Sequence, residues 1–137
     1  MKRMISLTGG MLLLTAGAAL AQDAQPNCKD PQTQADMTQC AGLAAEKADK
    51  ALNAQYKKTR ASQVAFDADS SDDMKGAEKA LIAAQRAWIA FRDSQCISEG
   101  FQAHGGTMEP MLIAACTERM TIARTEELKA LEKGLGN

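Results

Sequence analysis

Histidine and aromatic residues are scarce in this chain of 137 residues, which holds one His, one Trp, one Tyr and three Phe. A single His, together with the lack of a Gly-x-Ser-x-Gly motif, leaves no nucleophile and base at a recognisable spacing. No segment alternates between polar and apolar residues over a useful length, so no β-sheet is expected. The sequence therefore predicts an all-α protein that is not an enzyme and has no cofactor.

An excess of basic charge is also lacking, because 16 Lys and Arg stand against 17 Asp and Glu. Binding to nucleic-acid phosphates requires a basic surface, which this composition does not supply. A cationic partner is electrostatically easier to attract. Nucleic acid is therefore not expected as a partner.

The first 21 residues have the order of a secretory signal peptide. Lys2 and Arg3 precede a short apolar run centred on 11–14, and Ala19-Leu20-Ala21 supplies the small residues for cleavage after Ala21. The run is too short to span a membrane, and no Cys lies at the cleavage site to carry a lipid anchor. We expect a periplasmic or secreted protein whose residues 22–137 form one domain, with 14 basic against 17 acidic residues and no membrane contact.

Three helices are expected in this domain. Thr33 followed by Asp36 is a variant of the capping box, so the first helix should begin there and run toward Val64. Residues 65–73 are small and acidic and predict a loop, with Ser70 or Ser71 capping the second helix. Short connections make successive helices antiparallel. The predicted fold is a small antiparallel three-helix bundle.

The second helix should run to about Ala103, where His104-Gly105-Gly106 ends it. Thr107 then caps the third helix, and Pro110 is tolerated in its first turn. Four cysteines, an even number in an exported chain, indicate two disulfides. With so few aromatic residues the core is thin, so these bonds should carry a large share of the stability.

The bulky residues gather in 81–96, where apolar side chains recur at steps of three and four. We expect Trp88 and Phe91 to lie in the core. Arg124 falls in line with the apolar residues of the third helix and therefore needs a partner. Asp93 is the carboxylate that we expect to pair with it, and Asp49 is the alternative.

Two groups of residues have the spacing of metal ligands. The acidic loop follows positions 1, 3, 5, 7 and 12 of a calcium-binding EF-hand with Asp67, Asp69, Ser71, Asp73 and Glu78. Asp72 stands where that loop needs Gly, which favours a solvated loop with capping carboxylates. His104, Met108 and Met111 resemble copper ligands, but Met at helical spacing favours the core. No metal site is predicted.

Several spaced motifs resemble one known family, the lysozyme inhibitor LprI N-terminal-like domain. They cover the predicted mature chain and comprise Cys28 to Cys40 with Thr33 and Met37, Asp49-x-x-Leu52-Asn53-x-x-Tyr56, Gln85-Arg86-x-Trp88-x-x-Phe91-Arg92-Asp93-x-x-Cys96, Gly105-Gly106-Thr107, and Cys116 with Thr121, Arg124, Thr125 and Leu128. Phe91 replaces an expected Tyr, and Thr107 a common Ser. The resemblance implies an exported bacterial domain, and one lineage of the family is associated with inhibiting lysozyme.

Helix geometry predicts which cysteines pair. Cys40 lies about 10 Å along a helix that begins at Thr33, and the approach from Cys28 can fold back over that distance. Cys96 and Cys116 lie at similar distances on either side of Gly105-Gly106, so an antiparallel pair of helices brings them level. We predict the bonds Cys28–Cys40 and Cys96–Cys116.

Two functions remain open at this point. The first is an inhibitor or binder of lysozyme or another cell-wall hydrolase, in which the connection His104-Gly105-Gly106-Thr107 enters the cleft of the enzyme. The second is a structural or stress-related binding module of the periplasm. Binding to immobilised lysozyme distinguishes them.

Overall fold

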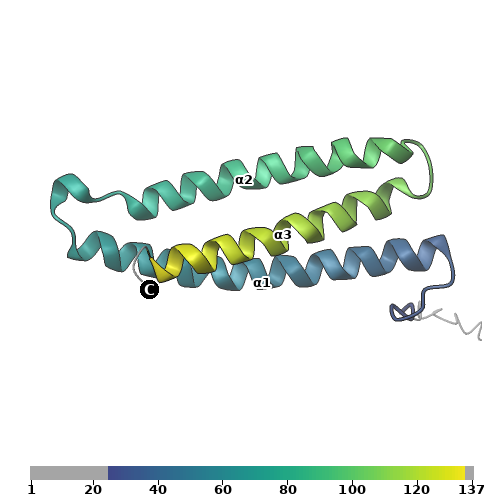
Figure 1. Cartoon of the computed structure of the whole chain (residues 1–137), viewed down its shortest axis with the longest axis horizontal. Helices are drawn as coiled ribbons and strands as arrows, with labels where there is room; N and C mark the ends of the chain where they lie inside the picture. The colour runs from purple at the N-terminus through teal and green to yellow at the C-terminus, as the bar shows by residue number, and fades with distance from the viewer. Residues whose placement is uncertain (1–24, 135–137) are drawn as a thin grey trace, which may run out of the picture.

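A computed structural model describes residues 25–134 as three long helices that run side by side in an elongated bundle (Figure 1). The helices are α1 (Gln34–Asp69), α2 (Ala77–Gly100) and α3 (Glu109–Lys133), with short 3-10 turns at Asp72–Met74 and Phe101–Ala103. Residues 25–134 contain no strand. The predicted all-α fold is confirmed, whereas the predicted signal peptide, residues 1–21, lies outside the described residues.

The start of α1 has the predicted capping box. The Thr33 hydroxyl accepts a hydrogen bond from the Asp36 amide at 3.0 Å, and the Asp36 carboxylate accepts one from the Thr33 amide at 3.1 Å. Together they satisfy two backbone donors that a helix otherwise leaves without partners.

The end of α1 was predicted five residues too early. The helix continues through the expected loop to Asp69, since 65–69 contain no Gly or Pro to interrupt it. Ser70 and Ser71 do not cap α2, which begins only after Gly76 with a φ of 136°. The cap comes instead from Asp67 on α1, whose carboxylate accepts hydrogen bonds from the amides of Gly76 and Ala77 at 2.9 Å and of Glu78 at 3.1 Å.

This contact has an electrostatic consequence. The three hydrogen bonds from the backbone of 76–78 lower the pKa of Asp67. A carboxylate is also favourable beside the positive end of the α2 dipole. Asp67, which is position 1 of the calcium pattern, therefore joins α1 to α2 and fixes the turn between them.

The connection from α2 to α3 is longer than predicted, because α2 ends at Gly100 and α3 begins only at Glu109. A 3-10 turn, Phe101–Ala103, follows α2, and Gly105 adopts a φ of 76°. The prediction that Thr107 caps α3 is wrong, because α3 starts at Glu109 with Met108 at the capping position and no side-chain cap. Pro110 lies in the first turn, as expected.

The core is thin and partly polar. Leu52, Leu81 and Leu128 form its apolar centre, and Tyr56 and Trp88 pack against it. Five polar side chains are also buried: Gln55, Thr59, Gln85, Thr121 and Thr125. The Thr59 hydroxyl, which is fully buried, donates to the Leu128 carbonyl at 3.0 Å and so joins α1 to α3.

Phe91 is not part of this core, contrary to prediction, because 59% of its surface is exposed. Trp88 faces inward. In an α-helix, Arg92, four positions later, lies closer to the face of Trp88 than Phe91, three positions later. Arg92 therefore occupies the inner position that the apolar pattern had assigned to Phe91.

Both predicted disulfides are confirmed. Cys28 joins Cys40, and Cys96 joins Cys116, each with 5.4 Å between the Cα atoms. The second bond is buried and holds α2 against α3 close to their connection. Beside it, a Cβ on Gly100 would lie 2.5 Å from Ile113, so the two helices approach closely here.

Candidate functional site

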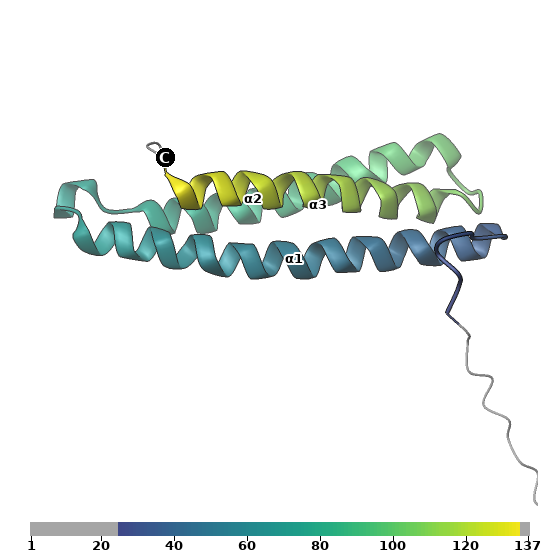
Figure 2. The same cartoon turned by 60° about the horizontal axis from the view of Figure 1, so that its bottom comes forward.

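The connection between α2 and α3, residues 103–107, lies at one end of the bundle, beside the start of α1, and is called the tip below (Figure 2). The His104 ring stacks on Phe101 with 4.3 Å between centroids and 5° between planes. Its Nδ1 lies 2.9 Å from Glu109 Oε1, and the Gly105 amide donates to Glu109 Oε2 at 2.8 Å. These contacts hold the tip in one conformation.

Glu109 is the centre of this arrangement. Its hydrogen bonds with His104 and with the Gly105 amide lower its pKa. Phe101 and Met108 flank the tip and are 58% and 46% exposed. The tip thus combines polar groups, an aromatic stack and apolar surface at one end of the bundle.

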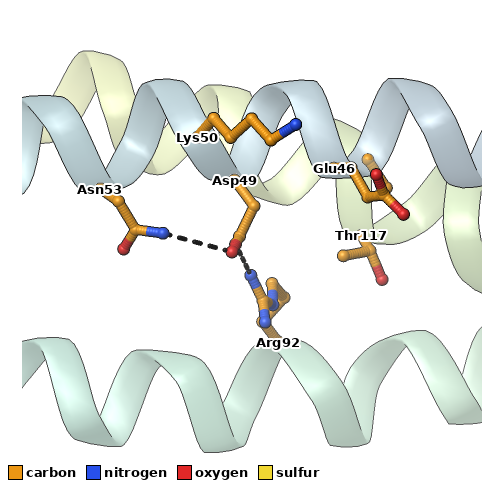
Figure 3. Close-up of a pocket in the computed structure, with 7 residues that line it drawn as sticks. Glu46, Asp49, Lys50, Asn53, Arg92 and Thr117 are labelled. Atoms are coloured by element: carbon orange, nitrogen blue, oxygen red, sulfur yellow. Dashed lines mark hydrogen bonds and ion pairs between the residues drawn. The ribbon is translucent and has the colours of Figure 1, made fainter.

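A second surface, which the sequence did not predict, surrounds Arg92. The Arg92 guanidinium donates to Asp49 on α1 and to Asp93, each at 2.9 Å, and to the Thr121 hydroxyl on α3 at 3.2 Å. Figure 3 shows the side chains of Asn53 and Arg92 both directed at Asp49. Only 13% of the Arg92 side chain is exposed, and its guanidinium lies 5.1 Å from the centre of the Trp88 ring.

These contacts offset the cost of burying the Arg92 charge. Burial lowers the pKa of Arg92, but the hydrogen bonds with Asp93 and Asp49 outweigh burial and raise it above its usual value. One cation therefore connects all three helices.

The predicted pairing of Arg124 with Asp93 or Asp49 is wrong, because Arg92 occupies both carboxylates. Arg124 donates instead to Gln85 at 3.1 Å and to Glu127 at 2.8 Å, and its guanidinium lies 5.9 Å from the Trp88 ring. The spacing of Arg92, four residues after Trp88, was the signal that could have revealed the central cation.

Two neighbouring depressions lie between α1 and α2. The first, of about 400 Å³, contains the Asp49–Arg92 contact. The second, of about 350 Å³, is called the Tyr56 depression, and Asn53 belongs to both. The lining of the Tyr56 depression is Asn53, Tyr56, Arg60, Ile82, Gln85, Arg86 and Ile89.

Three of the residues considered as metal ligands, Asp67, His104 and Met111, have other partners. Asp67 caps α2, His104 binds Glu109, and the Met111 sulfur accepts from Gln34 at 3.5 Å. Within 25–134, no group of three or more His, Cys, Asp or Glu side chains could hold a metal ion.

Fold and surface together define a class: a helical domain with two disulfides and a tip whose His104 and Gly105 are hydrogen-bonded to Glu109. The family model of lysozyme inhibitor LprI matches residues 25–128, so the chain belongs to this family. The family expected from the sequence motifs is thereby confirmed.

A relative from Rhizobium meliloti (strain 1021), uncharacterized protein R02472, is 41% identical over 130 residues, which cover 93% of this chain and 94% of the relative. No solved structure matches the chain. Among the described helices, none has the length and apolar character needed to cross a membrane.

Proposed function

We propose that this protein is exported to the periplasm, after removal of residues 1–21, and inhibits lysozyme by inserting the tip into the cleft of the enzyme. Membership of the LprI family supports this proposal. In this role the protein is a binding protein and not an enzyme. The tip is proposed as the surface that binds lysozyme because hydrogen bonds with Glu109 hold it in place.

The physical case rests on rigidity and charge. The buried Cys96–Cys116 bond lies just behind the tip, and Glu109 holds His104 and Gly105 in place. A loop that is already ordered loses less conformational entropy when it binds. The excess of acidic residues in 22–137 favours encounter with a basic enzyme.

The contact within the cleft follows from the groups that the tip presents. Catalytic carboxylates lie in the clefts of glycoside hydrolases. His104 uses Nδ1 for Glu109, so its Nε2 is the ring atom for a partner, and the exposed Thr107 supplies a hydroxyl. Phe101 and Met108 add apolar area around them.

Lysozyme-driven clearing of a bacterial cell-wall suspension tests this function. The purified domain, residues 22–137, should slow clearing, and the double variant His104→Ala with Thr107→Ala should lose about tenfold or more in inhibitory potency. Ser94→Ala with Ser98→Ala is the matched control, since both serines are exposed on α2 and neutral, and it should inhibit normally.

The possible failures are distinguishable. No inhibition by the unchanged domain at a large molar excess contradicts the proposed function. Full inhibition by the His104→Ala, Thr107→Ala variant leaves the function standing and rules out the tip as the binding surface.

A further inference from the structure

The Tyr56 depression presents hydrogen-bond donors but no acidic side chain. Arg60 on α1 and Arg86 on α2 both line it, and neither Asp nor Glu does. Arg60 forms an ion pair with Glu78 at 2.6 Å, through Nε and one terminal nitrogen. Arg86 forms no hydrogen bond or ion pair with any residue in 25–134. The depression therefore carries a cationic group that its own surroundings do not neutralise.

Gln85 provides an independent indication of a ligand. Only 6% of Gln85 is exposed, and its carbonyl oxygen accepts from Arg124 at 3.1 Å. Its amide nitrogen donates to no acceptor within 25–134, yet it is not sealed from solvent, since no buried side-chain nitrogen or oxygen lacks a partner. The Tyr56 depression is the cavity that Gln85 lines beside Arg86, so the two N–H donors are available there.

The rest of the lining is apolar or aromatic. Ile82 and Ile89 come from α2, with Ile89 40% exposed, and the Tyr56 side chain comes from α1. Sites for small organic ligands combine such walls with a few placed polar groups. A hydrated inorganic anion gains nothing from two isoleucines, whereas a carboxylate attached to an aliphatic group uses both parts of the lining.

We propose that the Tyr56 depression binds the terminal carboxylate of a peptide. The Arg86 guanidinium and the Gln85 amide donate to the carboxylate oxygens, and the aliphatic side chain of the terminal residue packs on Ile82 and Ile89. The hydrogen bonds are charge-assisted, and the planar guanidinium suits the two oxygens of a carboxylate. This site is separate from the tip and does not depend on inhibition of lysozyme.

Titration of the 15N-labelled domain with N-acetyl-alanyl-alanine, followed by NMR, tests the proposal. The resonances of the Gln85 side-chain amide and of Ile89 should shift saturably. The same peptide with a C-terminal amide should bind with an affinity at least about tenfold lower, because it lacks the negative charge that Arg86 pairs with.

Arg86→Gln should weaken binding of the acid peptide about tenfold, while its thermal melt stays unchanged, because Arg86 is exposed and forms no hydrogen bond or ion pair within 25–134. Lys58→Gln is the matched control, since it removes one positive charge from the side of α1 that faces away from Tyr56. This control should bind normally.

Any of these results would overturn the proposal: no saturable shift with the acid peptide up to about 10 mM, equal binding of the acid and amide peptides, or equal loss in Arg86→Gln and Lys58→Gln. Inorganic phosphate serves as a further probe. If phosphate binds as tightly as the acid peptide, the site recognises anions in general and the peptide assignment is wrong.

Discussion

Replacing both Cys96 and Cys116 by Ala should lower the free energy of unfolding by about 3 kcal/mol. The bond closes a loop with a sequence separation of 20, and the entropy of closing such a loop in the unfolded chain gives this value. Ala is the right substitute because both cysteines are buried and a Ser hydroxyl would need a partner there. For a small domain, the loss is a large part of a net stability of about 5 to 15 kcal/mol.

Urea denaturation followed by far-ultraviolet circular dichroism measures this loss. With a slope of about 2 kcal/mol per molar urea, the midpoint should fall by about 1.5 M. The double replacement of Cys28 and Cys40 by Ala is the matched control, because its loop has a similar separation of 12. Loop length alone predicts nearly the same cost for both bonds.

The structure predicts a different outcome for the control. The segment 27–32 makes only local hydrogen bonds, between residues two or three positions apart, so without its disulfide it also gains freedom in the folded state. The cost of losing Cys28–Cys40 should therefore stay below about 1 kcal/mol. Equal midpoints for the two double variants would refute this reasoning.

Two further predictions concern the helix faces and the α1–α2 turn. Trp88→Ala should destabilise the bundle by about 3 kcal/mol, because it removes the largest side chain that packs against the leucine core. Phe91→Ala should change the melting temperature little, because Phe91 is exposed. Equal effects of the two changes would contradict the placing of Trp88 on the inner face of α2 and of Phe91 on its exposed face. Asp67→Asn should lower the melting temperature at pH 7. Because hydrogen bonds from the 76–78 amides lower the pKa of Asp67, its charge stabilises the fold above the unfolded pKa of about 4, and this contribution is lost as pH falls through the folded pKa. The melting temperatures of the unchanged domain and of Asp67→Asn should therefore converge as the pH falls. A constant difference between them from pH 7 to pH 2 would exclude the charge as the cause.

Local signals in the sequence were sufficient for much of this fold. The capping box at Thr33 and Asp36 needs only residues three positions apart, and the two disulfides follow from helix length and from one turn. The missed cap of α2 is different, because Asp67 acts on amides nine to eleven residues later. That contact exists only after two helices have packed.

Residue type misled the assignment of the inner face of α2. Phe91 is apolar and lies at helical spacing, yet Arg92 takes the buried position, since Asp49, Asp93 and Thr121 surround its guanidinium. Pattern reading assigns charges to the surface and cannot see partners on other helices. The same limit hid the depressions between α1 and α2, which depend on how far apart the two helices pack.

The buried polar residues also bear on handedness. Three antiparallel helices can be wound in two mirror-related senses, and a core of Leu and Ala discriminates weakly between them. Thr59 reaches the carbonyl of Leu128 on α3, while Arg92 on α2 reaches Asp49 on α1. In the opposite winding the flanks of each helix exchange neighbours, so these donors and acceptors would be separated, and the buried Thr59 hydroxyl would lose its partner on α3. The polar side chains therefore favour one handedness of the bundle, a choice that its small apolar core makes poorly by itself.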